Sequence, residues 1–114
     1  EHLTSRVEAA VRAGVARQQL VVDPGIGFGK ALSHNLTLLR ELSRFAALGL
    51  GLLVGTSRKR MIGDLTGRPV EERDPASATL AALSIAAGAH WVRVHNVAAT
   101  KDAVTLAGAI YPLP

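Results

Sequence analysis

The sequence predicts an α/β fold in which a parallel sheet is built from successive β/α units. Three short apolar segments, residues 20–22, 50–54 and 91–94, have the composition of buried strands. They begin roughly 30 and 40 residues apart, which leaves room for a helix and its loops in each interval. Short continuous apolar strands that alternate with helices are typical of parallel sheets covered by helices on their outer face.

Two helices are expected in the first half of the chain. Apolar residues recur with helical periodicity over about residues 2–13, and Gly14 is suited to end that helix. Ser33 is suited to act as the N-cap of a second helix at roughly 34–48, which Gly49 ends. These helices flank the first predicted strand.

The second half continues the same alternation. Residues 61–65 predict a short helix, and the charged, proline-containing segment 67–75 predicts a surface loop. An alanine-rich helix is expected at about 75–87 with Gly88 at its end, and a final helix from about Thr100 to Ile110. Trp91 and Phe45 are interpreted as packing residues, and His34 and His90 as surface or capping residues.

The order of these elements matches the later part of a (β/α)8 barrel or part of an open doubly wound sheet. In either architecture, ligands bind at the carboxyl ends of the strands. The 114 residues form one domain or part of one. Because the chain starts inside a helical pattern and not with Met, we expect it to be a piece of a longer protein.

Composition excludes several classes of protein. The absence of cysteine excludes disulfides and thiolate zinc sites and fits a cytoplasmic location. No apolar run approaches the roughly 20 residues that span a bilayer, so no membrane association is expected. The net charge is +4, and several cations follow predicted strands instead of forming one basic face. This favours a small anionic ligand over nucleic acid, for which aromatic residues interleaved with the cations are also missing.

The segment Gly55-Thr56-Ser57-Arg58-Lys59-Arg60 follows the second predicted strand and is the strongest candidate for an anion site. Cations at the start of a helix oppose the helix dipole, so they are unfavourable there unless an anion binds. Ser57 is suited either to cap the short helix or to present its hydroxyl to a carboxylate. A solvated charge run is the alternative.

The segment Asp23-Pro24-Gly25-Ile26-Gly27-Phe28-Gly29-Lys30 follows the first predicted strand. Its spacing matches neither the Walker A loop nor the dinucleotide-binding glycine pattern. A carboxylate at a strand end, such as Asp23, is suited to accept paired N–H donors from a heterocycle edge. The alternative is a flexible βα loop whose glycines adopt positive φ.

Arg93 and His95 follow each other at alternate positions in the third predicted strand. Alternation directs both side chains to the same side, where a cation and an imidazole would be costly to bury without partners. They are therefore candidates for anion binding, and a structural ion pair is the alternative.

Taken together, these segments resemble the carboxyl-terminal part of the dihydropteroate synthase family, the pterin-binding (β/α)8 enzymes of folate synthesis. The resemblance rests on residues 23–30, on Ser33-His34-Asn35-Leu36, on residues 53–59 with Ile62-Gly63, and on Arg93-Val94-His95. It implies that residues 1–114 form about the last three β/α units of such a barrel.

The resemblance implies a transferase that condenses a dihydropterin-methyl pyrophosphate with p-aminobenzoate, forming dihydropteroate and pyrophosphate. Sulfonamides would compete with p-aminobenzoate. Magnesium would be the cofactor, bound through an Asn in the amino-terminal half that this chain lacks, with no metal ligand in the chain itself. A homodimer is also implied, with the helix at 75–87 as a candidate contact.

The resemblance assigns catalytic roles to Lys59, Arg93 and His95. Lys59 would contact the pterin ring, and its stem would form one wall of the p-aminobenzoate site. Arg93 would stack over the pterin and, together with His95, would hold the pyrophosphate.

The remaining substrate-binding positions implied by the resemblance are Asp23, Phe28, Gly55, Ser57 and Arg58. Asp23 would bind the amino-pyrimidine edge of the pterin, and Phe28 would form another wall of the p-aminobenzoate site. Ser57 would meet the p-aminobenzoate carboxylate, with Arg58 in support.

Two positions depart from the family pattern. Arg60 stands where many members have a small residue, which would alter the rim near the p-aminobenzoate site. Asn96 stands where an Asp commonly follows Arg-x-His, which removes one charge beside the pyrophosphate. Because half of the barrel is missing, we expect the isolated chain to be inactive.

Two further hypotheses remain open at this stage. The related folate-binding methyltransferase barrels share a pterin pocket, but Ser57-Arg58-Lys59 with Arg93-x-His95 favours the synthase. A non-catalytic half-barrel that self-associates through its open sheet edges is the second alternative.

Overall fold

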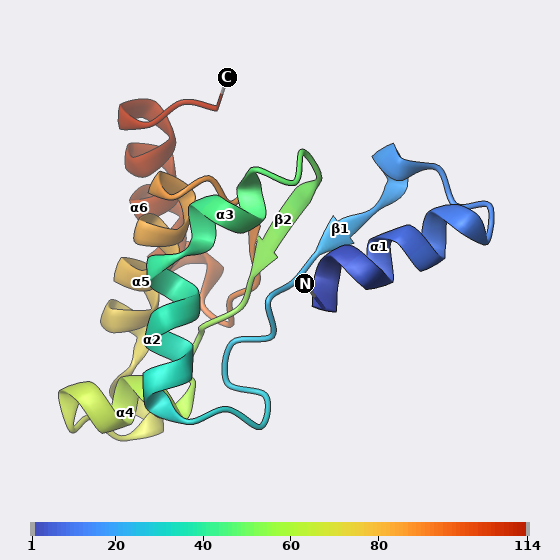
Figure 1. Ribbon diagram of the computed structural model, residues 1–114. Coiled ribbons are helices and arrows are strands. Elements are labelled where there is room, and N and C mark those ends of the chain that lie inside the picture. Colours follow the sequence, from blue (N-terminus) through green and yellow to red (C-terminus); the bar gives the residue numbers. More distant parts are fainter. Residues whose placement is uncertain (1, 114) are drawn as a thin grey trace.

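A computed structural model describes residues 2–113 of the chain as an α/β domain (Figure 1). In chain order the elements are α1 (His2–Arg12), the 3₁₀ turn η1 (Arg17–Gln19), β1 (Val21–Val22), α2 (Leu32–Arg40), α3 (Leu42–Ala46), β2 (Gly51–Val54), α4 (Arg60–Thr66), the 3₁₀ turn η2 (Val70–Glu72), α5 (Asp74–Ala86), β3 (Trp91–Val92) and α6 (Val97–Ile110).

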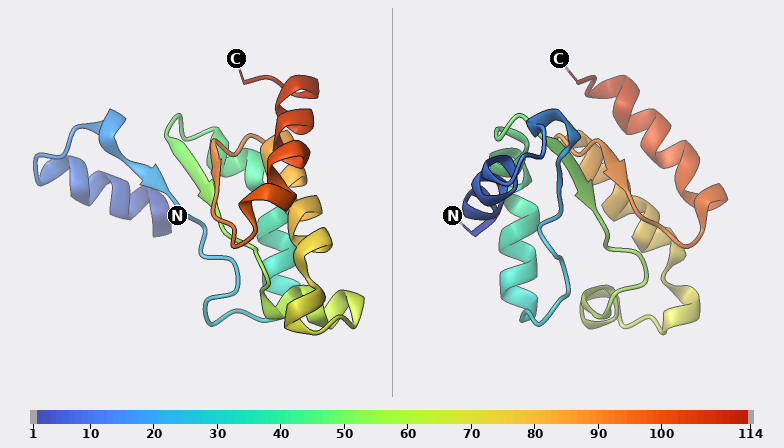
Figure 2. Two further views of the ribbon diagram at one scale, coloured as in Figure 1. Left: turned by 180° about the vertical axis from the view of Figure 1, so that it is seen from behind. Right: turned by 90° about the vertical axis from the view of Figure 1, so that its right-hand side faces the viewer.

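The sheet has the predicted parallel topology, with β2 between β1 and β3. Val21 is paired with Gly51 on one side of β2, and Leu53 is paired with Trp91 on the other. Neighbours in the sheet are therefore also neighbours in the sequence, as in successive strands of a barrel. Helices α2, α3, α5 and α6 lie on one side of the sheet, and α1 lies beside β1 (Figures 1 and 2).

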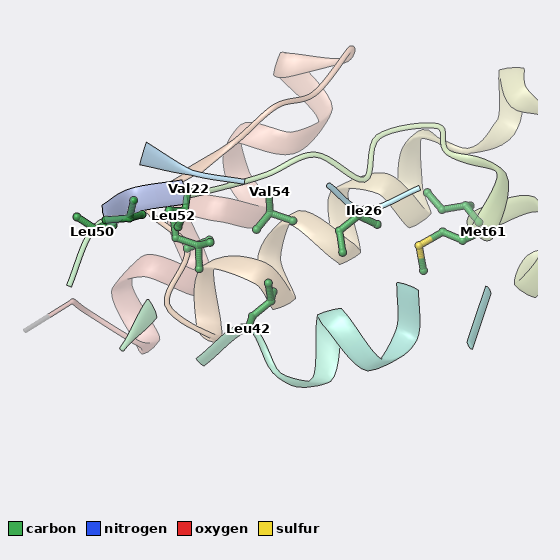
Figure 3. Packing of buried hydrophobic residues seen from close by; sticks show 10 residues of the cluster. Val22, Ile26, Leu42, Leu50, Leu52, Val54 and Met61 are labelled. Carbon is green, nitrogen blue, oxygen red and sulfur yellow. The ribbon is translucent and has the colours of Figure 1, made fainter. Parts of the chain in front are cut away.

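The core lies between the sheet and its helices. Val22, Leu52 and Val54 face the helices and are at most 4% exposed. Ile26, in the loop after β1, is fully buried and packs in the same cluster, with Leu42 of α3 and Met61 of α4 (Figure 3). One residue of the glycine-rich loop is thus anchored in the core, which fixes that loop to the sheet.

The opposite face of the sheet is largely open. Val21 is 51% exposed and Trp91 is 53% exposed, so Trp91, which was expected to pack, lies outside the buried core, with its ring against Gly51 of β2. In a parallel sheet, paired residues share a face, which places Trp91 with Leu53 on the side away from the helices. Phe45, by contrast, does pack against the core.

The helix predicted at 34–48 is instead two helices, α2 and α3, separated at Glu41 (φ −105°, ψ 18°). Ser33 is not an N-cap, because α2 begins at Leu32 after Ala31 and has no side-chain cap. Asn35 lies in the first turn of α2, and its Oδ1 accepts a hydrogen bond from the backbone N–H of Gly27.

Strand β3 ends at Val92, two residues earlier than predicted, and α6 begins at Val97 instead of near Thr100. The side chain of Asn96 accepts a hydrogen bond from the N–H of Ala99 and caps α6. Arg93 and His95 therefore lie in a loop and not on a strand. The other predicted helices and strands lie within one residue of the observed bounds. None of the helices formed by residues 2–113 is both long enough and apolar enough to cross a membrane.

Replacing Leu52 by Ala should destabilise the domain by about 2–5 kcal/mol, because Leu52 is fully buried and its truncation leaves a cavity. Urea denaturation measures this change. Leu65→Ala is the control, since Leu65 is 56% exposed and should change stability by less than about 0.5 kcal/mol. Equal effects of the two substitutions would contradict the packing described above.

Candidate functional site

Three loops meet at the carboxyl edge of the sheet, as predicted from the strand-end motifs. They are the β1–α2 loop (residues 23–31), the β2–α4 loop (55–59) and the β3–α6 loop (93–96). Parallel neighbouring strands end on the same edge, so side chains that are far apart in sequence become neighbours here.

Asp23 and Arg93 connect the outer two loops. Both terminal nitrogens of Arg93 lie close to Oδ2 of Asp23, at 3.4 and 3.5 Å. The other carboxylate oxygen, Oδ1, accepts the N–H of Gly25 at 2.8 Å. The ion pair is long and half exposed, so both charges remain available to a ligand.

Arg93 also lies directly over the backbone of the middle loop. A Cβ atom at Gly55 would be 2.6 Å from Nη2 of Arg93, so any side chain there would require the guanidinium to move. Gly55 therefore provides the space in which the guanidinium crosses the β2–α4 loop to reach Asp23.

The glycine-rich β1–α2 loop has the backbone predicted for it, with positive φ at Gly25, Gly27 and Gly29. Lys30 turns back into this loop, and its Nζ donates to the carbonyl oxygen of Gly25 at 2.9 Å. Asn35 is 4% exposed and holds the N–H of Gly27 at 2.8 Å. The loop is therefore ordered by its own contacts, which favours a preformed site over a flexible connection.

Lys59 reaches from the middle loop onto the β1–α2 loop. Its Nζ donates to the carbonyl oxygen of Ile26 and lies 4.5 Å from the centre of the Phe28 ring. Burial lowers the pKa of Lys59 below the ordinary lysine value, and the positive charges of Arg93 and Lys30 lower it further, while Asp23 partly opposes them. An anion bound here would relieve this unfavourable accumulation of positive charge.

Ser57 and His95 connect the middle and third loops. Oγ of Ser57 accepts the backbone N–H of His95 at 3.1 Å and lies 2.8 Å from Nδ1 of its ring. A hydroxyl can both donate and accept, so the tautomer of the His95 ring decides which of the two atoms donates in this second contact. Ser57 does not cap α4, so the capping alternative is wrong.

The backbone of Arg58 is left-handed (φ 58°), the one such non-glycine residue in the part of the chain described here. This conformation is unfavourable for a side chain of this size and needs external support. The N–H of Arg58 donates to Oγ of Ser77 at 2.9 Å, and its carbonyl oxygen accepts from Nη1 of Arg73 at 3.1 Å. Its guanidinium pairs with Asp74, with Nε 2.8 Å from Oδ1.

A hollow of about 630 Å³ lies between the β1–α2 loop and the start of α4, and its lining includes Phe28, Lys30, Asn35, Lys59 and Arg60. Arg60 is almost fully exposed at its rim, 3.9 Å from Asp64. Arg60 thus borders this hollow. Asp23, Ser57, Arg93 and His95 are not among the residues that line it, and they lie along the rim beside it.

The sequence analysis assigned no role to Asn35 and interpreted Asp74 as surface. The second interpretation is wrong, because Asp74 is only 23% exposed and connects two loops of the site. A signal was present, since an Asp before the Pro of a predicted helix is an ordinary N-terminal residue. Its partner Arg58, however, is distant in sequence and could not be identified from spacing.

Within residues 2–113, no group of three His, Cys, Asp or Glu side chains is placed to hold a metal ion. Asp23 is the carboxylate nearest to the predicted pyrophosphate residues, and it is already paired with Arg93. The described residues alone therefore do not fit a metal site.

The fold and this rim of basic side chains match one class of enzymes. The sequence model of the pterin binding enzymes matches residues 1–95, and the chain belongs to this family. Among its relatives are the dihydropteroate synthases of Neisseria meningitidis serogroup C and Escherichia coli K12. The first is 46% identical over 105 residues and the second 43% identical over 103 residues.

Each of these alignments covers 90% of this chain but only 37% and 36% of the relative, so the chain spans little more than a third of such proteins. Solved structures show the same partial coverage. A Coxiella burnetii dihydropteroate synthase in complex with pteroic acid superposes with a TM-score of 0.94 at 36% identity, over 98% of this chain and 43% of that one. A Yersinia pestis dihydropteroate synthase in complex with a sulfonamide drug gives 0.91 at 40% identity, over 96% and 40%. The fold is therefore the carboxyl-terminal part of a (β/α)8 barrel, as predicted.

Domain stability should fall as the pH decreases from about 4 to about 2, in part through Asp74. Hydrogen bonds from Arg58 and Asn96 lower the pKa of Asp74 from 3.8 to about 2. Folding thus favours the ionised form of Asp74. The resulting contribution to stability is fully present above the pKa that Asp74 has in the unfolded chain, and it is lost as the pH falls through the pKa of the folded chain. Urea denaturation between pH 2 and 5 measures it.

In Asp74→Asn the decrease in stability over this pH interval should be smaller than in the parent chain. Asp102→Asn, an identical change on the exposed surface of α6, should leave the pH profile unchanged. Parallel profiles for the parent and Asp74→Asn would show that Asp74 titrates normally in the folded state.

Proposed function

We propose that this chain is the carboxyl-terminal part of a dihydropteroate synthase, which joins the methylene carbon of a dihydropterin-methyl pyrophosphate to the amine of p-aminobenzoate. The observation that carries the proposal is the convergence of Asp23, Lys59, Arg93, Ser57 and His95 on one rim. This convergence occurs in a chain that is 43–46% identical to two such synthases over most of its length.

In the proposed reaction, the bond between the methylene carbon and the pyrophosphate oxygen breaks and a bond to the amine nitrogen forms, with loss of a proton from that nitrogen. Arg93 and the ring of His95 are suited to bind the leaving pyrophosphate. Fixed donors that face a developing anion can lower the barrier by several kcal/mol. No side-chain nucleophile is needed.

Asp23 is proposed to bind the amino-pyrimidine edge of the pterin. Its Oδ1 already accepts the N–H of Gly25, which orients the carboxylate plane and leaves lone pairs on both oxygens for a ligand. Arg93, held beside Asp23 and over Gly55, is in position to stack on the same ring system. The pair would then both orient and partly neutralise the ligand.

The p-aminobenzoate site is proposed to lie between Phe28, Lys59 and Ser57. Lys59 and the exposed ring of Phe28 lie together at the edge of the hollow, which supports their role as its walls. Ser57 supplies a hydroxyl for the carboxylate, and Arg58 supports it from behind. Relatives bound to pteroic acid and to a sulfonamide favour the same ligand classes here.

Magnesium, if used, is proposed to be bound by residues outside 2–113, because the described side chains do not gather into a metal site. We also propose a homodimer in which α5 contributes to the contact, a cytoplasmic location, and inactivity of the isolated chain. The last proposal follows from a chain that covers little more than a third of its relatives.

Replacing Lys59 by Ala should weaken binding of p-aminobenzoate about tenfold, or about 1.4 kcal/mol, through loss of a cation and of a wall of the site. Isothermal titration calorimetry on the chain measures the affinity. Lys101→Ala is the matched control, because Lys101 lies exposed on α6. Equal affinities in both variants would contradict the proposed site, and preference for a folate without p-aminobenzoate binding would favour a methyltransferase.

The release of pyrophosphate in the presence of magnesium tests turnover. Steady release by the isolated chain would contradict the proposal that this chain is inactive on its own.

Replacing Gly55 by Ala should weaken binding of inorganic pyrophosphate by about tenfold with little change in stability. The new Cβ would force the mobile end of Arg93 away from Asp23, whereas the backbone at Gly55 needs no positive φ. Gly108→Ala, where a Cβ meets open space, is the control and should bind as the parent does. Unchanged pyrophosphate affinity in Gly55→Ala would argue against a role for Arg93 in binding the leaving group.

A further inference from the structure

Asp74, the first residue of α5, connects two loops of the site through a single carboxylate. Its Oδ1 accepts from Nε of Arg58 at 2.8 Å, in the β2–α4 loop. Its Oδ2 accepts from Nη2 of Arg58 at 3.2 Å and from Nδ2 of Asn96 at 3.0 Å, in the β3–α6 loop. The same two loops carry Ser57 and His95, which hydrogen-bond to each other.

The Arg58 side of this connection determines the direction of the chain between Ser57 and Lys59. A left-handed residue reverses the local path of the backbone, and here all three polar parts of Arg58 are bound by residues at the start of α5. The guanidinium is bound by Asp74 through two parallel N–H···O contacts, a geometry that restricts its orientation as well as its position.

The Asn96 side requires an amide and not a carboxylate. Oδ1 of Asn96 is occupied by the N–H of Ala99 at the start of α6, which turns Nδ2 toward Asp74. With Asp at position 96 and Asp74 unchanged, two carboxylates would be in contact at the distance now bridged by this hydrogen bond. An acid at 74 and an amide at 96 are therefore a matched pair.

We propose that Asp74 is a positioning residue of the site, whose carboxylate on α5 joins the β2–α4 loop to the β3–α6 loop. It acts through Arg58 and Asn96, and it fixes the hydroxyl of Ser57 and the ring of His95 relative to each other. The consequence for ligand binding rests on the proposed function, whereas the positioning itself does not.

The exchange variant Asp74→Asn/Asn96→Asp tests this inference. Each single substitution breaks the match, leaving either two amides or two carboxylates between the loops. The double substitution restores one acid and one amide and keeps an oxygen at position 74 to accept from Nε of Arg58, whereas Nη2 loses its acceptor. A merely structural benefit of an acid in the first turn of α5 would be lost in Asp74→Asn and would not return in the double variant. Rescue therefore separates positioning from helix stabilisation.

The first measurement is nuclear magnetic resonance of the Arg58 Nε–H and of the His95 ring nitrogens. Hydrogen exchange at Nε should be at least several-fold faster in each single variant and should return toward the parent rate in the double variant. The His95 Nδ1 shift should follow the same order. Asp102→Asn should resemble the parent. If either single variant matches the parent, or if the double variant is no better than Asp74→Asn, the inference is wrong.

The second measurement is p-aminobenzoate affinity in the same set of variants. We expect about tenfold weaker binding in each single variant and recovery to within about threefold of the parent in the double variant. A parent chain that binds no p-aminobenzoate would contradict the proposed function of this site but not the positioning role, which the exchange rates then decide alone. If the single variants bind p-aminobenzoate weakly and the double variant does not recover the affinity of the parent, the inference is wrong.

Discussion

The pairing of β2 with a parallel strand on each side is the constraint on which the rest of this structure depends. Val21 pairs with Gly51, and Leu53 pairs with Trp91, so β1 and β3 are held in register by a strand of only four residues. His90, which directly precedes β3, reinforces this short sheet with two hydrogen bonds to Leu52 of β2. The backbone N–H of His90 donates to the carbonyl oxygen of Leu52, and Nδ1 of His90 accepts from the backbone N–H of Leu52. Because all three strands point the same way, every strand-end motif of the sequence reaches one rim.

Once the rim is formed, each loop is held by its neighbours. Lys59 crosses to the β1–α2 loop over Gly27, where a Cβ would be 2.8 Å from its Cδ, and Arg93 crosses to Asp23 over Gly55. These two approaches are possible only because glycine leaves the backbone bare. The result is a cluster of cations with one partial counter-ion, Asp23. Burial lowers the pKa of Lys59, and the neighbouring charges of Arg93 and Lys30 lower it further. An anionic ligand is the natural complement of such a cluster.

The sequence was sufficient to predict features that follow from local pattern. Residues 50–54 could be predicted as a strand because they form a continuous apolar run after a glycine. The position of Lys59 and Arg93 at one rim of the sheet could be predicted because both follow parallel strands. Features set by tertiary contacts could not be predicted in this way. Ser33 is a good N-cap in isolation, but α2 begins before it, at Leu32, and the contact between Asn35 and Gly27 that holds the first turn of α2 to a distant loop is not visible in local pattern. Trp91 is apolar, yet register places it on the open face.

Arg58 shows most clearly why part of the site was hidden from the sequence. Within a run of three cations, nothing in residue type distinguishes it from Lys59, and a positive φ would ordinarily predict glycine or asparagine. Its conformation is tolerated because Ser77, Arg73 and Asp74 satisfy its N–H, its carbonyl and its guanidinium. The strain is local, whereas its compensation comes from a helix that begins more than a dozen residues later. Arg58 is thus fully occupied by the protein, whereas Lys59, next to it in sequence, reaches onto the β1–α2 loop.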